Sequence, residues 1–215
     1  LAVAQTGLTE REARQLGIDT VVCHNLKPDR PEYMGGREMV IKGIADRQTG
    51  RLLGAQIVGY EGVDKRIDVF VTAITCKAKA EDLFHLDLAY APPFSTTKDP
   101  VMYTGMILEN NLRRGRGQVT AQELDEIIHS GVPYTLIDAR AKRQYEEGHI
   151  ETARSIPQED LRKAADALDK DTITITYCNK GVTGNAAQNI LLNKGFKKVY
   201  SLSGGQKQYR KTHGK

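Results

Sequence analysis

The sequence predicts two domains of different fold class, an α+β domain followed by an α/β domain with a parallel sheet. In the first half, strands and helices follow one another without strict alternation, which is typical of an α+β domain. In the second half, short β-branched stretches alternate with helical ones, which indicates a parallel sheet. Residues 113–118 form a glycine-spaced basic segment that cannot build a core. We therefore expect domains at 1–112 and 119–215, joined by this linker.

The first domain begins with a helix signal. Thr9 and Glu12, three residues apart, form the pattern of a capping box, and Gly17 is suited to follow the end of that helix. Further on, two alternating stretches flank the turn 46–50, which predicts a β-hairpin. The other elements expected here are a strand at 19–26 and helices at 64–77, 81–85 and 100–112, the last with Pro100 at a first-turn position.

The second domain shows the same kinds of signal in a regular order. Thr120 and Glu123 predict the capped start of a helix that continues to His129. Gly195 is suited to end the helix that precedes it, and the glycine pair at 204–205 is suited to end the strand before it. The elements expected are strands at 135–138, 172–177 and 198–202, a loop at 178–183 and a helix at 185–194.

Composition excludes several classes of protein. The 215 residues contain no apolar run near the ~20 residues that cross a bilayer, so we expect no membrane partner. Three cysteines at irregular spacing argue against a disulfide-stapled secreted domain and favour the cytoplasm. Net charge is −2 for residues 1–112 (13 basic, 15 acidic) and +6 for residues 113–215 (18 basic, 12 acidic). No aromatic residues interleave with the basic ones, so we expect no nucleic-acid partner.

The start of the chain and the two other cysteines lie outside the candidate sites. The chain lacks an initiating Met and opens as though in the middle of a strand, so we interpret it as a fragment of a longer protein. Cys23 and Cys76 are interpreted as buried structural thiols, and no His or Cys pair has the spacing of a zinc site.

The most informative segment is the loop that starts at Cys178. This cysteine follows a buried strand and precedes a helix, where open α/β sheets bind ligands. Backbone N–H groups, the helix dipole and Lys180 all place positive charge near the sulfur, which favours the nucleophilic thiolate. The same environment suits a persulfide anion. The alternative is a structural cysteine at a strand end, which the glycines around the loop and the adjacent lysine disfavour. A cysteine phosphatase is rejected, since Gly184 stands where its arginine would be.

The segment Cys178-Asn179-Lys180-Gly181-Val182-Thr183 resembles the active loop of rhodaneses, closely that of thiosulfate sulfurtransferases, which reads Cys-Arg-Lys-Gly-Val-Thr. Three further segments resemble family motifs in the same order: 136–140, 145–150 followed by Ser-Ile-Pro, and 200–205. The resemblance implies a rhodanese-like domain in which Cys178 accepts a sulfane sulfur and passes it to a nucleophile. The donor would be a persulfide, a polysulfide or thiosulfate.

The resemblance also implies which residues bind the substrate, and where this chain departs from the family. Asn179, Lys180, Gly181, Val182 and Thr183 would surround the transferred sulfur. Asn179 replaces an arginine of the thiosulfate enzymes, which removes one anion-binding charge. Two roles stay open for Arg140, an internal ion pair or contact with substrate. His149 is expected to be a structural hydrogen-bonding residue.

Residues 1–112 resemble the dimerisation domain of flavin-dependent pyridine nucleotide-disulfide reductases, in the branch of coenzyme A-disulfide reductase and NADH oxidase. The segments that carry the resemblance are 3–10 and 88–100, the latter with its Tyr-Ala-Pro-Pro sequence. The resemblance implies a homodimer through residues 1–112. It also implies that Tyr90, and less closely Tyr33, reach the partner subunit's active site, where a tyrosine hydroxyl can donate a proton. The alternative for both is a packing role.

Together the two resemblances imply the C-terminal part of an FAD- and NAD(P)H-dependent, coenzyme A-linked disulfide, persulfide or polysulfide reductase. No Gly-Xaa-Gly-Xaa-Xaa-Gly fingerprint occurs, so no cofactor is expected in this fragment. FAD, NAD(P)H and coenzyme A would belong to the full-length protein. The alternative is a non-catalytic module that dimerises and recruits a partner, within an NADH oxidase-like flavoprotein.

Overall fold

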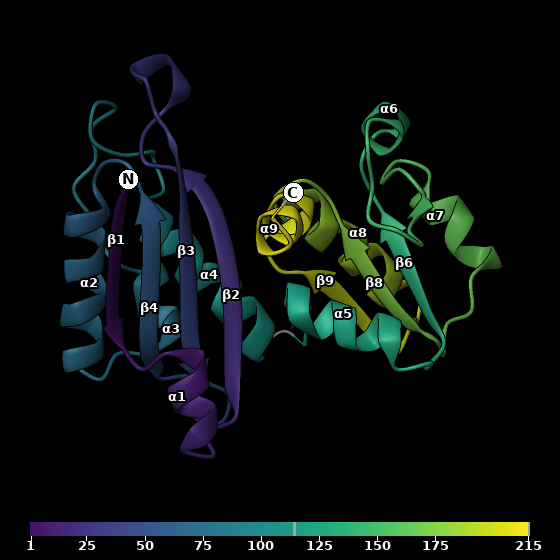
Figure 1. Cartoon of the computed structure of the whole chain (residues 1–215), viewed down its shortest axis with the longest axis horizontal. Coiled ribbons are helices and arrows are strands. Elements are labelled where there is room, and N and C mark those ends of the chain that lie inside the picture. Colours follow the sequence, from purple (N-terminus) through teal and green to yellow (C-terminus); the bar gives the residue numbers. More distant parts are fainter. Residues whose placement is uncertain (114, 215) are drawn as a thin grey trace. The chain divides into compact units, whose positions relative to one another are not determined.

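The computed structural model describes residues 1–113 and 115–214 and divides into two compact units, Leu1–Gly115 and Arg116–Lys215 (Figure 1). Helix α4 (Pro100–Arg113) continues one residue into the predicted linker, and strand β5 (Gln118–Val119) begins at the linker's last residue. Of the predicted linker and second domain, Arg114 and Lys215 lie outside the described residues.

The first unit is an antiparallel sheet with helices packed on it. The strand order is β1-β4-β3-β2, formed by β1 (Ala2–Gly7), β2 (Thr20–Pro28), β3 (Glu38–Asp46) and β4 (Leu52–Gly59). Helix α2 (Val63–Thr75) packs on β1 and β4, and α4 packs on β2 and β3. The paired residues Val3 and Val58 remain exposed on the sheet. This arrangement confirms the predicted α+β class.

Local signals explain the helices and the hairpin of this unit. Helix α1 (Glu10–Gln15) has the predicted capping box, in which the Thr9 hydroxyl accepts the Glu12 N–H and the Glu12 carboxylate accepts the Thr9 N–H. In the hairpin turn, the Asp46 carboxylate accepts the Gln48 N–H at 2.8 Å. Helix α3 (Ala80–Phe84) and the short 3₁₀ helix η1 (Glu32–Met34) complete the unit.

The second unit has the predicted parallel sheet, and helices cover both of its faces. Its strand order is β5-β9-β8-β6-β7, with β6 (Tyr134–Asp138), β7 (Arg154–Ser155), β8 (Ile173–Tyr177) and β9 (Val199–Leu202). The neighbours Leu136 and Ile137 on β6 point into different cores. The core around Ile137 lies between the sheet and α7 (Leu161–Ala164) and α8 (Val182–Asn193) on one face. The core around Leu136 lies between the sheet and α5 (Ala121–His129) and α9 (Gly205–Thr212) on the opposite face.

Several elements differ from the sequence-based expectation. Helix α8 begins at Val182, so the predicted loop 178–183 is shortened to residues 178–181. The sequence patterns did not reveal α6 (Lys142–Glu146), α7, α9, the 3₁₀ helix η2 (Ala165–Ala167) or the two-residue strands β5 and β7. None of these helices has a side-chain cap, and α9 is mostly polar, so the start and periodicity signals that predict helices are absent.

Candidate active site

The candidate nucleophile lies at the carboxyl end of a central strand of the parallel sheet. Cys178 directly follows β8, which runs between β6 and β9, and the residue is only 5% exposed. The Thr176 hydroxyl donates to the Gly184 carbonyl at 2.8 Å and so joins the end of β8 to the first turn of α8. The strand and helix thereby fix the position of the short loop between them.

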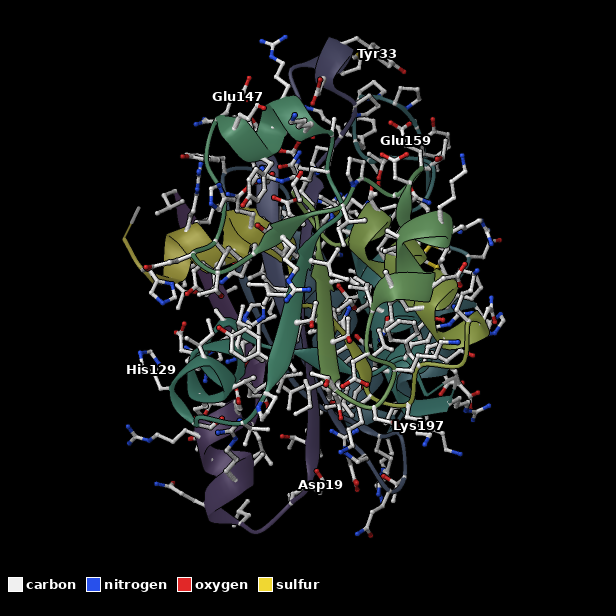
Figure 2. The ribbon with its side chains drawn as sticks, turned by 90° about the vertical axis from the view of Figure 1, so that its right-hand side faces the viewer. Asp19, Tyr33, His129, Glu147, Glu159 and Lys197 are labelled. Carbon is white, nitrogen blue, oxygen red and sulfur yellow. The ribbon has the colours of Figure 1, made fainter. Side chains whose placement is uncertain are left out.

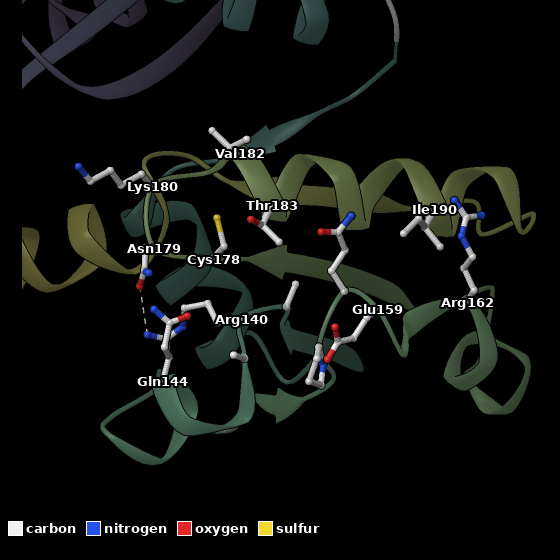
Figure 3. Close-up of a pocket in the computed structure, with 14 residues that line it drawn as sticks. Arg140, Gln144, Glu159, Arg162, Cys178, Asn179, Lys180, Val182, Thr183 and Ile190 are labelled. Atoms are coloured by element: carbon white, nitrogen blue, oxygen red, sulfur yellow. Dashed lines mark hydrogen bonds between the residues drawn. The ribbon is translucent and has the colours of Figure 1, made fainter. Parts of the chain in front are cut away.

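Within this loop, the sulfur atom faces a backbone amide. The Gly181 N–H donates to the Cys178 Sγ at 3.2 Å. Gly181 has φ +105°, a conformation that favours glycine and that turns this amide toward the sulfur. An N–H directed at sulfur stabilises negative charge on it. Figure 3 shows the Lys180 side chain extending away from the sulfur, so its charge acts from a distance.

The outer side of the loop is held by helix α9. The Gln206 N–H donates to the Cys178 carbonyl at 2.8 Å, and the Lys207 N–H donates to the Asn179 carbonyl at 3.0 Å. These carbonyls therefore point into the helix N-terminus and away from the pocket. The Gln206 side chain is also buried, and its amide donates to the Gly148 carbonyl at 2.7 Å.

Arg140 is held in an internal network at the rim of the site. Its guanidinium forms an ion pair with Asp138, with Nε 2.9 Å from Oδ1, and only 7% of the residue is exposed. The same group donates to the Gly148 carbonyl at 2.9 Å and to the Asn179 Oδ1 at 3.3 Å (Figure 3). The internal ion pair, one of the two roles left open above, is therefore present. Arg140 also lines the pocket, and its hydrogen bond to Oδ1 orients the side-chain amide of Asn179 there.

A pocket of about 710 Å³ opens beside the sulfur. Of the seven residues predicted for this site, six line it and Gly181 contributes its amide instead. The lining residues are Ala139, Arg140, Ala141, Gln144, Pro157, Gln158, Glu159, Arg162, Cys178, Asn179, Lys180, Val182, Thr183 and Ile190.

Sequence reasoning missed the wall formed by Gln144 and by residues 157–162. The motif Ser155-Ile156-Pro157 marks the start of this segment, and it was the one available signal. The lining side chains that follow it, Gln158, Glu159 and Arg162, are polar and exposed, and no pattern in the sequence distinguishes them from an ordinary surface. Their role depends on β7, which pairs with β6 and brings the segment beside the pocket.

The other predicted residues lie in the first unit. Tyr33 belongs to η1, at the tip of the loop between β2 and β3, and is 77% exposed (Figure 2). Tyr90 precedes the double proline and is 48% exposed. Arg66, only 1% exposed, ties the segments of both tyrosines together: it donates to the Asp29 carbonyl at 2.7 Å and forms an ion pair with Asp99. Because both tyrosines are exposed, neither side chain is buried in the core of the first unit.

The two remaining cysteines and His149 do not line the Cys178 pocket. Cys23 is buried, and burial raises the pKa of its thiol to about 12. The expectation for Cys76 was wrong, because this residue is exposed just after α2, where the helix ends at the surface. His149 is exposed, stacks on Tyr145 with ring centroids 3.8 Å apart, and its Nδ1 lies 3.1 Å from the Tyr145 carbonyl oxygen. In the described part of the chain, no group of His, Cys, Asp and Glu could hold a metal ion, and no helix is long and apolar enough to cross a membrane.

Comparison with known families agrees with the geometry of both units. Residues 120–212 match the model of the rhodanese-like domain. The chain is also similar to thiosulfate sulfurtransferase GlpE of Coxiella burnetii, which is 32% identical over 78 residues, covering 36% of this chain and 73% of that protein. The second unit belongs to the rhodanese-like family. Residues 1–100 match the pyridine nucleotide-disulphide oxidoreductase dimerisation domain, so the chain combines this domain with a rhodanese-like one.

Two longer proteins share parts of this architecture. The NAD(P)H coenzyme A polysulfide/persulfide reductase of Pyrococcus horikoshii is 40% identical over 108 residues, which covers 50% of this chain and 24% of that protein. The crystal structure of reduced CoADR-RHD from Bacillus anthracis matches 97% of this chain and 37% of its own, with 35% identity and a TM-score of 0.89. The chain therefore spans about a quarter to two fifths of these longer relatives.

Proposed function

We propose that the rhodanese-like unit transfers sulfur through a persulfide on Cys178. The observation that carries this proposal is the Gly181 N–H directed at the Cys178 sulfur, at the edge of an open pocket. The amide stabilises an anionic sulfur at this position, and the pocket admits a donor to it. Asn179, Lys180, Val182 and Thr183 line the space in which the transferred sulfur would lie.

The chemistry needs no oxidant or reductant. The Cys178 thiolate attacks the outer sulfur of a persulfide R–S–S⁻, the S–S bond breaks, and R–S⁻ leaves. With thiosulfate, the leaving group is sulfite. A second thiolate then attacks the outer sulfur of the Cys178 persulfide, takes that sulfur and releases the Cys178 thiolate. Each step forms one S–S bond and breaks one, so charge and electrons balance.

Mass spectrometry of the intact chain tests this proposal. After incubation with polysulfide and removal of the excess, we expect a mass increase of about 32 Da, one sulfur atom, that maps to Cys178. The Cys178→Ser variant should gain no mass at that peptide, and Cys76→Ser should load like wild type, which controls for the exposed second thiol. An unmodified Cys178 would contradict the proposal. It would instead support the alternative of a non-catalytic module that dimerises and recruits a partner.

For the full-length protein, we propose a reductase of disulfides, persulfides or polysulfides linked to coenzyme A, with FAD and NAD(P)H. The printed name of the Pyrococcus horikoshii relative, together with the dimerisation domain, supports this assignment. The antiparallel sheet of the first unit and the lack of a glycine fingerprint in the sequence support placing the FAD and NAD(P)H sites elsewhere in the full-length protein.

The proposal also includes dimer formation, the role of two tyrosines and the location in the cell. The first unit would form a homodimer, and the exposed Tyr90 and Tyr33 would reach the partner subunit's active site. A cytoplasmic location is supported by three unpaired cysteines, which suit a reducing compartment. Sedimentation of the chain, with and without the Tyr90→Phe change, tests the dimer and separates it from the role of the hydroxyl: the dimer should persist in the variant.

A further inference from the structure

The pocket beside Cys178 extends well beyond the sulfur. Figure 3 shows Cys178, Thr183, Ile190 and Arg162 in a row along helix α8, with Arg162 farthest from the sulfur. Thr183 and Ile190 are seven residues apart, so they lie on the same face of the helix about 10 Å from each other. The pocket is thus an elongated groove with the nucleophile near one end.

The volume of this groove is much larger than a small inorganic donor requires. About 710 Å³ lies within the range that holds organic ligands of drug size. A five-atom anion such as thiosulfate would fill only the part next to Cys178. The rest of the groove therefore indicates a substrate with an extended organic arm.

The far end of the groove carries a positive charge suited to an anion. Arg162 is the second residue of α7, and its neighbour Leu161 is fully buried in the core, which fixes the position of the arginine. Within residues 1–113 and 115–214, Arg162 forms no ion pair. Its guanidinium is therefore available to a carboxylate or phosphate, which it can bind through two parallel hydrogen bonds.

The wall between the two ends is polar but not cationic. Gln158 and Glu159 line it, and Figure 3 shows the Glu159 side chain on the wall opposite α8. These side chains can accept hydrogen bonds from amide or ammonium groups. The carboxylate of Glu159 disfavours a second anionic group in the middle of the arm.

We infer that Arg162 binds the anionic end of an extended low-molecular-weight thiol whose sulfur exchanges with Cys178 at the other end of the groove. This inference rests on the proposed sulfur transfer and names its substrate class. A thiol with an anionic terminus and hydrogen-bonding groups along its arm fits the sequence of groups along the groove. Glutathione and coenzyme A both have this chemistry, whereas 2-mercaptoethanol has neither the arm nor the charge.

The test is a single-turnover discharge of the Cys178 persulfide, which is monitored by the mass of the intact chain. The chain is loaded with polysulfide and then mixed with glutathione, coenzyme A or 2-mercaptoethanol at increasing concentration. For Arg162→Ala, we expect the half-saturating concentration to rise about fivefold for at least one of the two anionic thiols. It should not change for 2-mercaptoethanol, and the maximal discharge rate should stay the same. Arg162→Lys should restore part of the affinity.

Lys163→Ala provides the matched control, because Lys163 is the adjacent exposed cation and does not line the pocket. If Arg162→Ala raises the half-saturating concentration for glutathione alone or for coenzyme A alone, the result supports the inference and identifies the source of the anion. Equal half-saturating concentrations in wild type and Arg162→Ala for both would overturn it, as would an equal rise for 2-mercaptoethanol or in Lys163→Ala. A chain that takes up no sulfur would instead contradict the proposed function itself.

Discussion

Gly205 approaches Cys178 so closely that no side chain fits between them: a Cβ on Gly205 would lie 2.3 Å from the Cys178 carbonyl oxygen. The next residue, Gln206, donates its N–H to that same oxygen at 2.8 Å. The N-terminus of α9 therefore sets the outer side of the active loop, while the Gly181 N–H faces the sulfur on the inner side.

Gly205→Ala should lower both stability and sulfur loading. Gly195→Ala is the matched control, because Gly195 also has a positive φ, +87°, but a Cβ there would meet nothing within 4 Å. We expect about 1 kcal/mol of destabilisation for Gly195→Ala from its backbone conformation. Gly205→Ala should cost about 1–3 kcal/mol more, from the clash with the loop.

Urea unfolding and the polysulfide loading assay measure these two effects. Loading should slow only in Gly205→Ala, because only this change displaces the loop that holds the sulfur. Equal losses of stability and equal loading in the two variants would show that the close approach is unimportant.

Asn179→Arg should improve the use of thiosulfate. Asn179 lines the pocket, and the charge of the neighbouring Arg140 is compensated by its ion pair with Asp138. A new positive charge beside the sulfur would attract the doubly charged thiosulfate, and we expect kcat/KM for thiosulfate to rise about tenfold. Asn179→Met, similar in length but uncharged, should show no such rise in a steady-state assay with cyanide as acceptor. The idea fails if both variants behave alike.

Arg66→Met should strongly destabilise the first unit. Arg66 and Asp99 are almost fully buried, with Nη2 and Oδ2 2.9 Å apart, so removing the cation leaves a carboxylate unpaired in the core. The expected cost is about 3–5 kcal/mol in urea unfolding. Arg47→Met breaks the exposed pair with Asp19 and should cost less than about 1 kcal/mol. Similar costs for the two variants would contradict the role of burial.

Acid should weaken the first unit through His24. Burial, with a smaller contribution from Lys42, lowers the pKa of His24 to about 4 in the folded chain, against about 6.5 in the unfolded chain. Between these values the unfolded chain binds a proton that the folded chain does not. The free energy of unfolding should therefore fall with decreasing pH from about 6.5 to about 4, by about 1.4 kcal/mol per pH unit at most.

The His24→Gln variant isolates this effect. Urea unfolding at pH 7, 6 and 5 should show a shallower decline in the variant than in the wild type. Parallel declines would mean that His24 is not responsible for the acid sensitivity.

Sequence patterns predicted the elements that carry strong local signals. The capping boxes at Thr9 and Thr120 give the starts of α1 and α5, and the turn after Asp46 gives the hairpin. Helix α8 was predicted to begin three residues too late, because the positive φ of Gly181, which precedes its first residue Val182, cannot be seen in the sequence. The elements without caps or apolar periodicity, such as α9, were missed altogether.

By itself, the sequence determined the two fold classes and indicated Cys178 as the candidate nucleophile, since both depend on residue type and local spacing. Only the tertiary structure decided which groups meet Cys178. Helix α9 and residues 157–162 come from distant parts of the chain, and parallel pairing of β6, β7, β8 and β9 brings them to one edge of the sheet. Such contacts depend on long-range packing of side chains, which spacing along the chain does not encode.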